Sequence, residues 1–201
     1  MESVPAASAG QALQDIAYGG NLAQWKQAAV SLKLRMAMRL ADSNPSLSQA
    51  MAESAFNAGP IVANTDNFGI NYLVAAPNTN PLWVSLVQSG RKDFVAANTL
   101  VDAMNPNNDP RLPSFFQMYE GEYVGGTYGS ANGASSNSDL SELLKTPDLK
   151  GDLITAAEVH FLLSEVAARG YSVGGTEEAY YNSAIEISMN EWGVSLEAAA
   201  T

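Results

Sequence analysis

The sequence predicts a mainly α fold, built from paired helices with long irregular loops inserted between the pairs. Apolar residues recur at steps of three and four in five segments of the chain. Residues that cap or stop helices, such as Asn, Pro, Thr and Gly, mark the ends of these segments. Two long stretches, residues 60–92 and 105–150, lack a helical period over most of their length and are rich in small and polar residues.

The first pair of helices is expected over residues 22–41 and 46–58. Between them, Asn44 is a good N-cap, and Pro45 suits the first helical position, where its missing N–H costs nothing. Gly59 then ends the second helix. The first helix carries an apolar stripe on one face, formed by Leu22, Trp25, Ala29, Leu32 and Met36. The short break between the two segments predicts an antiparallel helical hairpin.

Three further helices are expected over residues 93–104, 152–169 and 176–192. The segment 152–169 is apolar on almost all sides, which indicates that other helices cover two of its faces. Thr176 is a good cap for the last helix, which forms a second hairpin with the helix before it. Such Ala-rich pairs suggest stacking of the tetratricopeptide kind, although no fixed period indicates a plain repeat array. We expect one domain over residues 1–201.

The composition excludes several classes of function. The chain has 21 acidic and 10 basic residues and a net charge of −11, which argues against binding to nucleic acid or to an anionic lipid surface. It contains no cysteine and one histidine, His160, so no disulfide, thiolate or zinc site is expected. We expect neither a metal nor a cofactor.

The sequence also bears on the membrane. No run of apolar residues is long enough to cross a bilayer, and residues 1–5 lack the basic start and apolar run of a signal peptide. A lipid anchor needs a cysteine, which the chain does not have. If the parent protein is exported or lipidated, we expect the segment responsible to lie outside this sequence.

Two pairs of charged residues are expected to join helices. Arg35 and Arg39 lie four residues apart on one helix, where like charges repel mildly, so acidic partners are expected for both. Glu158 and Glu165 share one face of another helix and are the expected partners, while Arg169 also suits Glu165 at a spacing of four. Two carboxylates can instead mark a glycosidase. The sequence offers no nucleophile beside His160, and we expect no catalytic residues.

The irregular stretches contain the candidate ligand contacts. Sugars are held by flat aromatic faces together with amide and carboxylate hydrogen bonds, and both kinds of residue occur here. Each aromatic side chain could equally fill the space between a loop and a helix. The candidate contacts are Tyr72, Asn80, Trp83, Tyr123 and Tyr128.

Six strings, taken in order, resemble the SusD/RagB-type nutrient-binding proteins. Each string alone is weak, but their order and spacing over residues 15–194 are specific. In chain order they are Trp25 to Leu40, Ser89 to Asp102, Asn108-Asp109-Pro110-Arg111-Leu112-Pro113, Tyr123-Val124-Gly125-Gly126, Ala157 to Tyr171, and Tyr180 to Val194.

The resemblance implies an α-superhelix of tetratricopeptide-like helix pairs with long irregular insertions. Members of this family are lipoproteins on the outer face of the outer membrane. They cover a SusC-like TonB-dependent transporter and capture oligosaccharides or other nutrients for import, without catalysis. The family's signal peptide, lipid-bearing cysteine, N-terminal helices and C-terminal portion have no counterpart here, so an internal piece of a member is expected.

Two other interpretations remain open at this point. The chain could be a helical protein–protein interaction module that binds no small ligand. It could also be a glycoside hydrolase that uses Glu158 and Glu165. For a nutrient-binding protein, the sequence leaves the nutrient open among glycan, glycopeptide and peptide.

Overall fold

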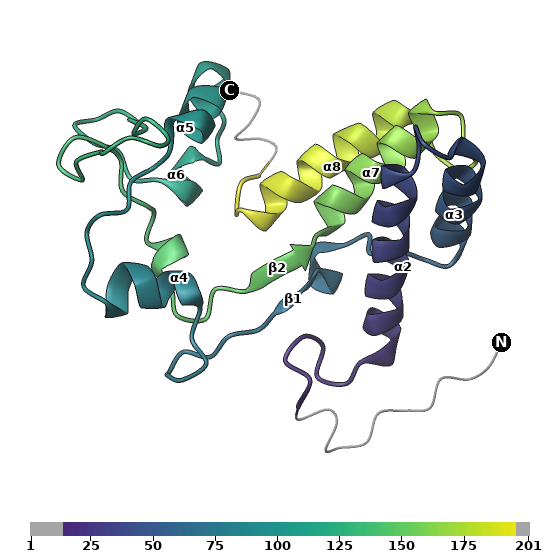
Figure 1. Ribbon diagram of the computed structural model, residues 1–201, viewed down its shortest axis with the longest axis horizontal. Coiled ribbons are helices and arrows are strands. Elements are labelled where there is room, and N and C mark those ends of the chain that lie inside the picture. The colour runs from purple at the N-terminus through teal and green to yellow at the C-terminus, as the bar shows by residue number, and fades with distance from the viewer. Residues whose placement is uncertain (1–13, 196–201) are drawn as a thin grey trace. The chain divides into compact units, whose positions relative to one another are not determined.

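The computed structural model describes residues 14–195, and the chain forms two compact units. Of these residues, the first unit contains 14–70 together with 152–191, and the second contains 71–151 with 192–195. The structure therefore shows two compact units where the sequence indicated one domain. Helices dominate the chain, as predicted, and are labelled in Figure 1.

Two helical hairpins build the first unit. The first consists of α2 (Leu22–Arg39) and α3 (Pro45–Asn57), and the second of α7 (Ala156–Ala168) and α8 (Glu177–Glu191). The members of each hairpin pack against each other, and α2 also packs against α7 (Figure 1). The predicted mainly α fold of paired helices is confirmed.

The predicted helix caps are present. The side chain of Asn44 accepts a hydrogen bond from the backbone N–H of Leu47, 3.2 Å away, and Pro45 is the first residue of α3. The hydroxyl of Thr176 accepts from the N–H of Ala179 at 3.2 Å, directly before α8. These contacts satisfy N–H groups that have no partner within their own helix.

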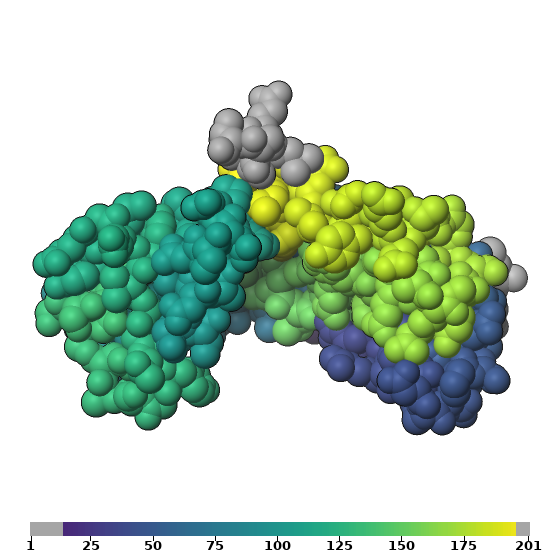
Figure 2. Space-filling view, turned by 90° about the horizontal axis from the view of Figure 1, so that it is seen from above, coloured from purple at the N-terminus to yellow at the C-terminus, as the bar shows by residue number. Residues whose placement is uncertain are grey.

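The second hairpin also meets α3 through the turn that follows α7. The backbone N–H of Ser172 donates to a carboxylate oxygen of Glu53 at 2.9 Å, and the hydroxyl of Tyr171 donates to the carbonyl of Pro45 at 3.4 Å. Figure 2 shows this contact at the surface, where blue atoms of α3 lie against yellow-green atoms of the segment after α7. The two hairpins thus form one packed body.

Small side chains line the contacts between these helices. Alanine at the contact surfaces lets the helix backbones approach closely, and larger apolar side chains fill the remaining space to the density of a protein interior. The most fully buried members of this core are Leu34, Ala37, Ala52, Ala55, Ile61, Ala156, Val159, Leu163, Val166 and Val173.

The apolar stripe predicted for α2 does not face this core. Leu32 and Met36 are 44 % and 53 % exposed, whereas Leu34 and Ala37 are fully buried. The helix is apolar on two sides, and the side with the smaller residues packs against α3 and α7. The buried residues of α2 are Ala28, Ser31, Leu34, Ala37 and Met38.

An ion pair joins α2 to the start of α7. The guanidinium of Arg35 reaches both carboxylate oxygens of Glu158, at 2.5 and 2.6 Å, and donates to the carbonyl of Leu153 at 2.7 Å. The hydrogen bond to Glu158 raises the pKa of Arg35. This two-pronged geometry is the strongest form of an arginine–carboxylate contact.

The predicted pair between Arg39 and Glu165 does not form, because Glu165 pairs within its own helix. Glu165 pairs with Arg169 at 2.9 Å, four residues along α7, and Arg169 also contacts Asp42 at 2.9 Å. Arg39 makes no ion pair with any residue in the described part of the chain. Its exposed position at the end of α2 lets water solvate the charge, so no acidic partner is needed.

The helix predicted over residues 152–169 begins at Ala156, four residues later than expected. Residues Gly151–Ile154 form β2, which pairs with β1 (Phe68–Ile70) in a two-stranded sheet. Thr155 then caps α7 by accepting from the N–H of Glu158. Buried Asn67 fixes this junction, because its side-chain oxygen accepts from the N–H of Ala156 at 2.7 Å.

Among the described residues, the second unit contains only short helices. These are α4 (Pro81–Trp83), which continues as one π-helical turn over Val84–Gln88, α5 (Asn98–Met104) and α6 (Leu112–Phe115). The stretches 60–92 and 105–150 are therefore irregular but ordered by short elements. A small core holds this unit together, formed by Ala96, Val101, Met104, Leu112 and Phe116.

The prediction of a helix over residues 93–104 was wrong in its first half. The helix begins only at Asn98. Before it, the N–H of Ala96 donates to the carbonyl of Ser138, and the carbonyl of Ala96 accepts from the N–H of Gly126, both at 2.8 Å. These contacts with distant residues use the backbone groups that a helix would need.

We predict that Glu158→Gln lowers the free energy of unfolding by about 1 kcal/mol, because it removes a two-pronged contact that is still about one-third exposed to water. Urea denaturation measures this change. Glu186→Gln, at an exposed position of α8, is the matched control and should stay close to the unchanged protein. Equal effects of the two substitutions would contradict the assigned role of the pair.

Asp15 organises the turn that leads into α2. Its carboxylate accepts from the backbone N–H groups of Ala17, Tyr18 and Gly20 and from the indole N–H of Trp25. Burial raises the pKa of Asp15, but these four hydrogen bonds outweigh that effect and lower the pKa from 3.8 to about 2.

Because the pKa is lower in the folded chain, ionised Asp15 stabilises the fold above pH 3.8, and this contribution disappears as the pH falls toward 2. We predict that Asp15→Asn lowers the melting temperature at neutral pH by several degrees more than at about pH 2. Thermal unfolding followed by circular dichroism checks this. The same loss of melting temperature at both pH values would contradict this prediction.

Candidate functional site

Tyr128 is presented to solvent on a fixed turn. Its side chain is 80 % exposed. Its backbone N–H donates to the side-chain oxygen of Asn98 at 3.1 Å, and the N–H of Thr127 donates to that of Asn132 at 2.9 Å. The amide of Asn132 donates in return to the carbonyls of Thr127 and Ser130. An aromatic ring is thus held out on a loop whose backbone is already ordered.

Two glycines bring this turn close to α5. A Cβ atom on Gly125 would lie 2.4 Å from the Cα of Asn98, and one on Gly126 would lie 2.7 Å from the side chain of Asn132. Only glycine allows such close approach. The pair Gly125-Gly126 therefore fixes the position from which Tyr128 projects.

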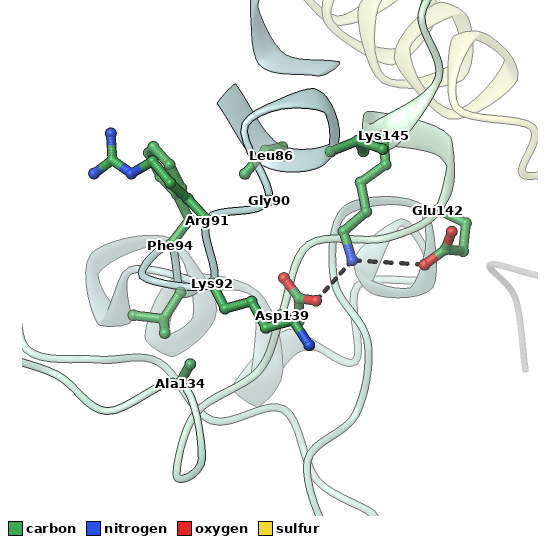
Figure 3. Close-up of a pocket in the computed structure, with 11 residues that line it drawn as sticks. Leu86, Gly90, Arg91, Lys92, Phe94, Ala134, Asp139, Glu142 and Lys145 are labelled. Atoms are coloured by element: carbon green, nitrogen blue, oxygen red, sulfur yellow. Dashed lines mark hydrogen bonds and ion pairs between the residues drawn. The ribbon is translucent and has the colours of Figure 1, made fainter. Parts of the chain in front are cut away.

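A cavity of about 520 Å³ lies within the second unit and is shown in Figure 3. Its size falls in the usual range for small-ligand sites. The walls come from two segments, residues 86–95 and 134–145, and the second segment follows directly on the Tyr128 turn. The lining residues are Leu86, Val87, Gly90, Arg91, Lys92, Phe94, Val95, Ala134, Asp139, Glu142 and Lys145.

Charged side chains meet on one wall of this cavity. The ammonium of Lys145 lies 2.6 Å from a carboxylate oxygen of Asp139 and 3.5 Å from one of Glu142 (Figure 3). The side chain of Lys145 is only 15 % exposed, so these contacts hold its charge in place.

Arg91 lines another part of the cavity. Arg91 pairs with Asp93 at 2.5 Å, and this hydrogen bond raises the pKa of Arg91 and lowers that of Asp93. The guanidinium carbon lies 5.0 Å from the centre of the Phe94 ring, a cation–π geometry. Both members of the ion pair are more than half exposed, so the contact contributes little to stability.

The cavity was not predicted from the sequence, because the candidate ligand contacts were aromatic residues and Asn80. Arg91 and Lys92 stand in one of the strings that carry the family resemblance. The approach of Lys145 and Asp139 to that segment is a long-range contact that no local pattern shows. The signal available in the sequence was the adjacent basic pair Arg91-Lys92.

Asn80 fixes the start of α4. It is 4 % exposed, and its side-chain oxygen accepts from the N–H of Leu82 at 2.7 Å. Its amide nitrogen donates to the carbonyl of Leu149, and its backbone N–H donates to that of Pro147, both at 2.7 Å. The polar groups of Asn80 are thus hydrogen-bonded within the second unit. A direct contact of Asn80 with a ligand stays a prediction.

The remaining predicted ligand contacts are half-buried. Trp83 is the last residue of α4, the helix that Asn80 caps. The ring of Tyr72 lies against Gly151, where an added Cβ would come within 3.1 Å. Tyr123 packs against the core of the second unit, and burial raises its pKa. Their part in ligand binding also stays a prediction.

The residues of the glycosidase alternative are engaged elsewhere. Glu158 binds Arg35, and Glu165 binds Arg169. The Nδ1 atom of His160 lies 2.9 Å from the carbonyl of Ala156, one turn earlier in α7. Both carboxylates and the histidine thus have structural contacts in the first unit.

Two further observations concern membranes and metals. In residues 14–195, no helix combines the length and the apolar character needed to cross a bilayer. The same part of the chain shows no group of three or more His, Cys, Asp and Glu side chains placed to hold a metal ion.

Comparison with known families identifies the chain. The SusD-like family described as "Starch-binding associating with outer membrane" matches residues 3–201. The chain belongs to this SusD-like family, which confirms the resemblance found in its sequence. No curated protein matches the chain.

Solved structures of SusD homologues share the fold. A chitin-binding SusD homologue from Flavobacterium johnsoniae is 30 % identical with a TM-score of 0.80, and the match covers 96 % of this chain and 40 % of that one. A homologue from Bacteroides thetaiotaomicron is 30 % identical with a TM-score of 0.82, over 96 % and 41 % of the two chains. One from Bacteroides uniformis is 30 % identical with a TM-score of 0.81, over 95 % and 40 %. The chain spans about two-fifths of the length of these relatives.

Proposed function

We propose that this chain is part of a nutrient-binding protein that holds an oligosaccharide at the cell surface without changing it chemically. Membership of a family described as starch-binding supports a carbohydrate ligand, as does similarity to a chitin-binding homologue. The structural observation that carries the proposal is the exposed Tyr128 ring on a turn ordered by Asn98 and Asn132.

The physical basis is preorganisation. A sugar ring has apolar faces that pack on an aromatic ring, and hydroxyl groups that need hydrogen-bond partners. Since the turn that carries Tyr128 is already fixed, binding loses little backbone entropy. The side-chain amides of Asn98 and Asn132 beside the turn can supply polar contacts. No chemical step is required of any side chain.

The proposal extends to location and partner. In the complete protein, we propose a lipid anchor on the extracellular face of the outer membrane and delivery of the nutrient to a SusC-like TonB-dependent transporter. The family description, which associates its members with the outer membrane, supports this location. The nutrient could also be a glycopeptide or peptide, because aromatic and amide groups bind those ligands as well.

A second candidate function has its own observation. The outer face of α2 exposes an apolar stripe, with Trp25, Leu32 and Met36 at 39 %, 44 % and 53 % exposure. Such a stripe at helical spacing is the kind of surface that another helix covers. A helical protein–protein interaction module without a small ligand would use this face rather than Tyr128.

We predict that Tyr128→Ala weakens oligosaccharide binding roughly five- to tenfold, the loss expected for one aromatic contact. Affinity gels containing chitin or starch fragments measure the change. Stability should be nearly unchanged, because the ring is exposed. Tyr181→Ala, which removes an exposed aromatic ring of α8 in the first unit, is the matched control and should bind like the unchanged chain. Equal binding by both variants would contradict the role of Tyr128.

Trp83→Ala provides a separate test. Because Trp83 is half-buried in α4, we predict both weaker retardation in the same gels and a lower melting temperature. A stability loss with unchanged binding would show that Trp83 only packs. Release of reducing sugar by the unchanged chain would instead favour a glycosidase.

A further inference from the structure

Gly133 follows Asn132 in the loop that continues from the Tyr128 turn, and this is the only Asn-Gly step in the sequence. The side-chain amide of asparagine is thermolabile, because the backbone nitrogen of the next residue can attack its carbon. Glycine obstructs this approach least, since it has no side chain. Gly133 is exposed, and its N–H donates to no acceptor within residues 14–195. The attacking nitrogen is thus free to react.

The side chain of Asn132 is held in a way that favours this attack. It is only partly buried, so water and hydroxide can reach it. Its Oδ1 atom accepts from the backbone N–H of Thr127 at 2.9 Å. When the nitrogen of Gly133 attacks the amide carbon, negative charge develops on Oδ1, and a donor that is already in place stabilises this charge. The surroundings of both reacting groups therefore permit the reaction.

Asn137, in the same loop, lacks these conditions. The residue that follows it is Ser138, which carries a side chain and is fully buried. The backbone N–H of Ser138 donates to the carbonyl of Val124 at 2.8 Å, so the corresponding nitrogen is engaged. Within this loop, the reaction is therefore expected at Asn132 and not at Asn137.

We propose that Asn132 is a site of spontaneous deamidation that releases the Tyr128 turn. The nitrogen of Gly133 loses its proton to hydroxide and forms a bond to the side-chain amide carbon of Asn132. The bond from that carbon to Nδ2 breaks, and Nδ2 takes up a proton from water and leaves as ammonia. Water then opens the cyclic imide, which leaves aspartate or isoaspartate at position 132.

The product cannot hold the turn as Asn132 does. The amide nitrogen of Asn132 donates to the carbonyls of Thr127 at 2.9 Å and Ser130 at 3.0 Å. A carboxylate has no N–H donor and repels both carbonyl oxygens. In isoaspartate the main chain also runs through the side-chain carbons, beside Gly126, where space is already tight. On the proposed function, deamidation limits how long the Tyr128 surface stays ordered for binding.

Peptide mapping by mass spectrometry tests the site on the full 201-residue chain, kept folded in warm, mildly alkaline buffer. We expect Asn132 to lose its amide severalfold faster than Asn137, at a rate that rises with pH and with isoaspartate among the products. Gly133→Ala should slow this loss severalfold, because its Cβ hinders the attack. The fold should tolerate that Cβ, which meets only the hydroxyls of Ser136 at 3.3 Å and Ser135 at 3.7 Å. Equal rates at Asn132 and Asn137, or no effect of Gly133→Ala, would overturn the site.

Hydrogen–deuterium exchange tests the consequence for the turn. Asn132→Asp reproduces the charge of the product, and Asn182→Asp, at an exposed position of α8 in the first unit, is the matched control. We expect amides of residues 126–130 to exchange roughly fivefold faster in Asn132→Asp, the factor that one lost hydrogen bond brings, and at the unchanged rate in Asn182→Asp. Equal exchange in the two variants would overturn the release of the turn. Neither measurement uses a ligand, so this inference and the proposed glycan binding can fail separately.

Discussion

The contact between Arg35 and Glu158 joins the two hairpins of the first unit, whose packed core brings the two side chains together. It joins two residues that are 123 positions apart in the sequence, and the same guanidinium also binds the carbonyl of Leu153 in β2. One side chain therefore fixes the packing of α2 on α7 and the point where β2 gives way to α7. Alanines at the helix contacts let the backbones come close enough for this contact to form.

The second unit is held by a different kind of interaction. Its helices are short, and much of its backbone is ordered by side-chain amides, with Asn80 at the start of α4 and Asn98 and Asn132 at the Tyr128 turn. An asparagine side chain offers both a donor and an acceptor, so it can replace the regular hydrogen bonds of a helix or sheet. An irregular segment ordered in this way can present exposed groups in fixed positions, as a passive binding surface requires.

Sequence reasoning identified the paired helices of the first unit because local signals specify them, such as Asn44-Pro45 before α3 and Thr176 before α8. The same signal, Asn80-Pro81, precedes α4 and was overlooked among irregular residues. Other predictions were wrong because long-range contacts decide the structure there. The backbone of Ala96 bonds to Ser138 and Gly126, so this residue does not join α5. The residues before α7 pair with β1 as a strand and are therefore not helical. The buried side of α2 depends on which of two apolar faces meets α7, and no local pattern decides this. For the same reason the cavity around Lys145 was not foreseen.

We propose that the second unit presents a binding surface that is ordered before ligand arrives, and that the helical first unit takes no part in binding. Hydrogen–deuterium exchange, with and without a bound oligosaccharide, tests it most directly. The account predicts that amides of α2 and α7 are strongly protected in both states, and that added protection is confined to residues 71–151 and centred on the Tyr128 turn and the cavity. Ligand-dependent ordering of α2 or α7, with no change in residues 71–151, would contradict it.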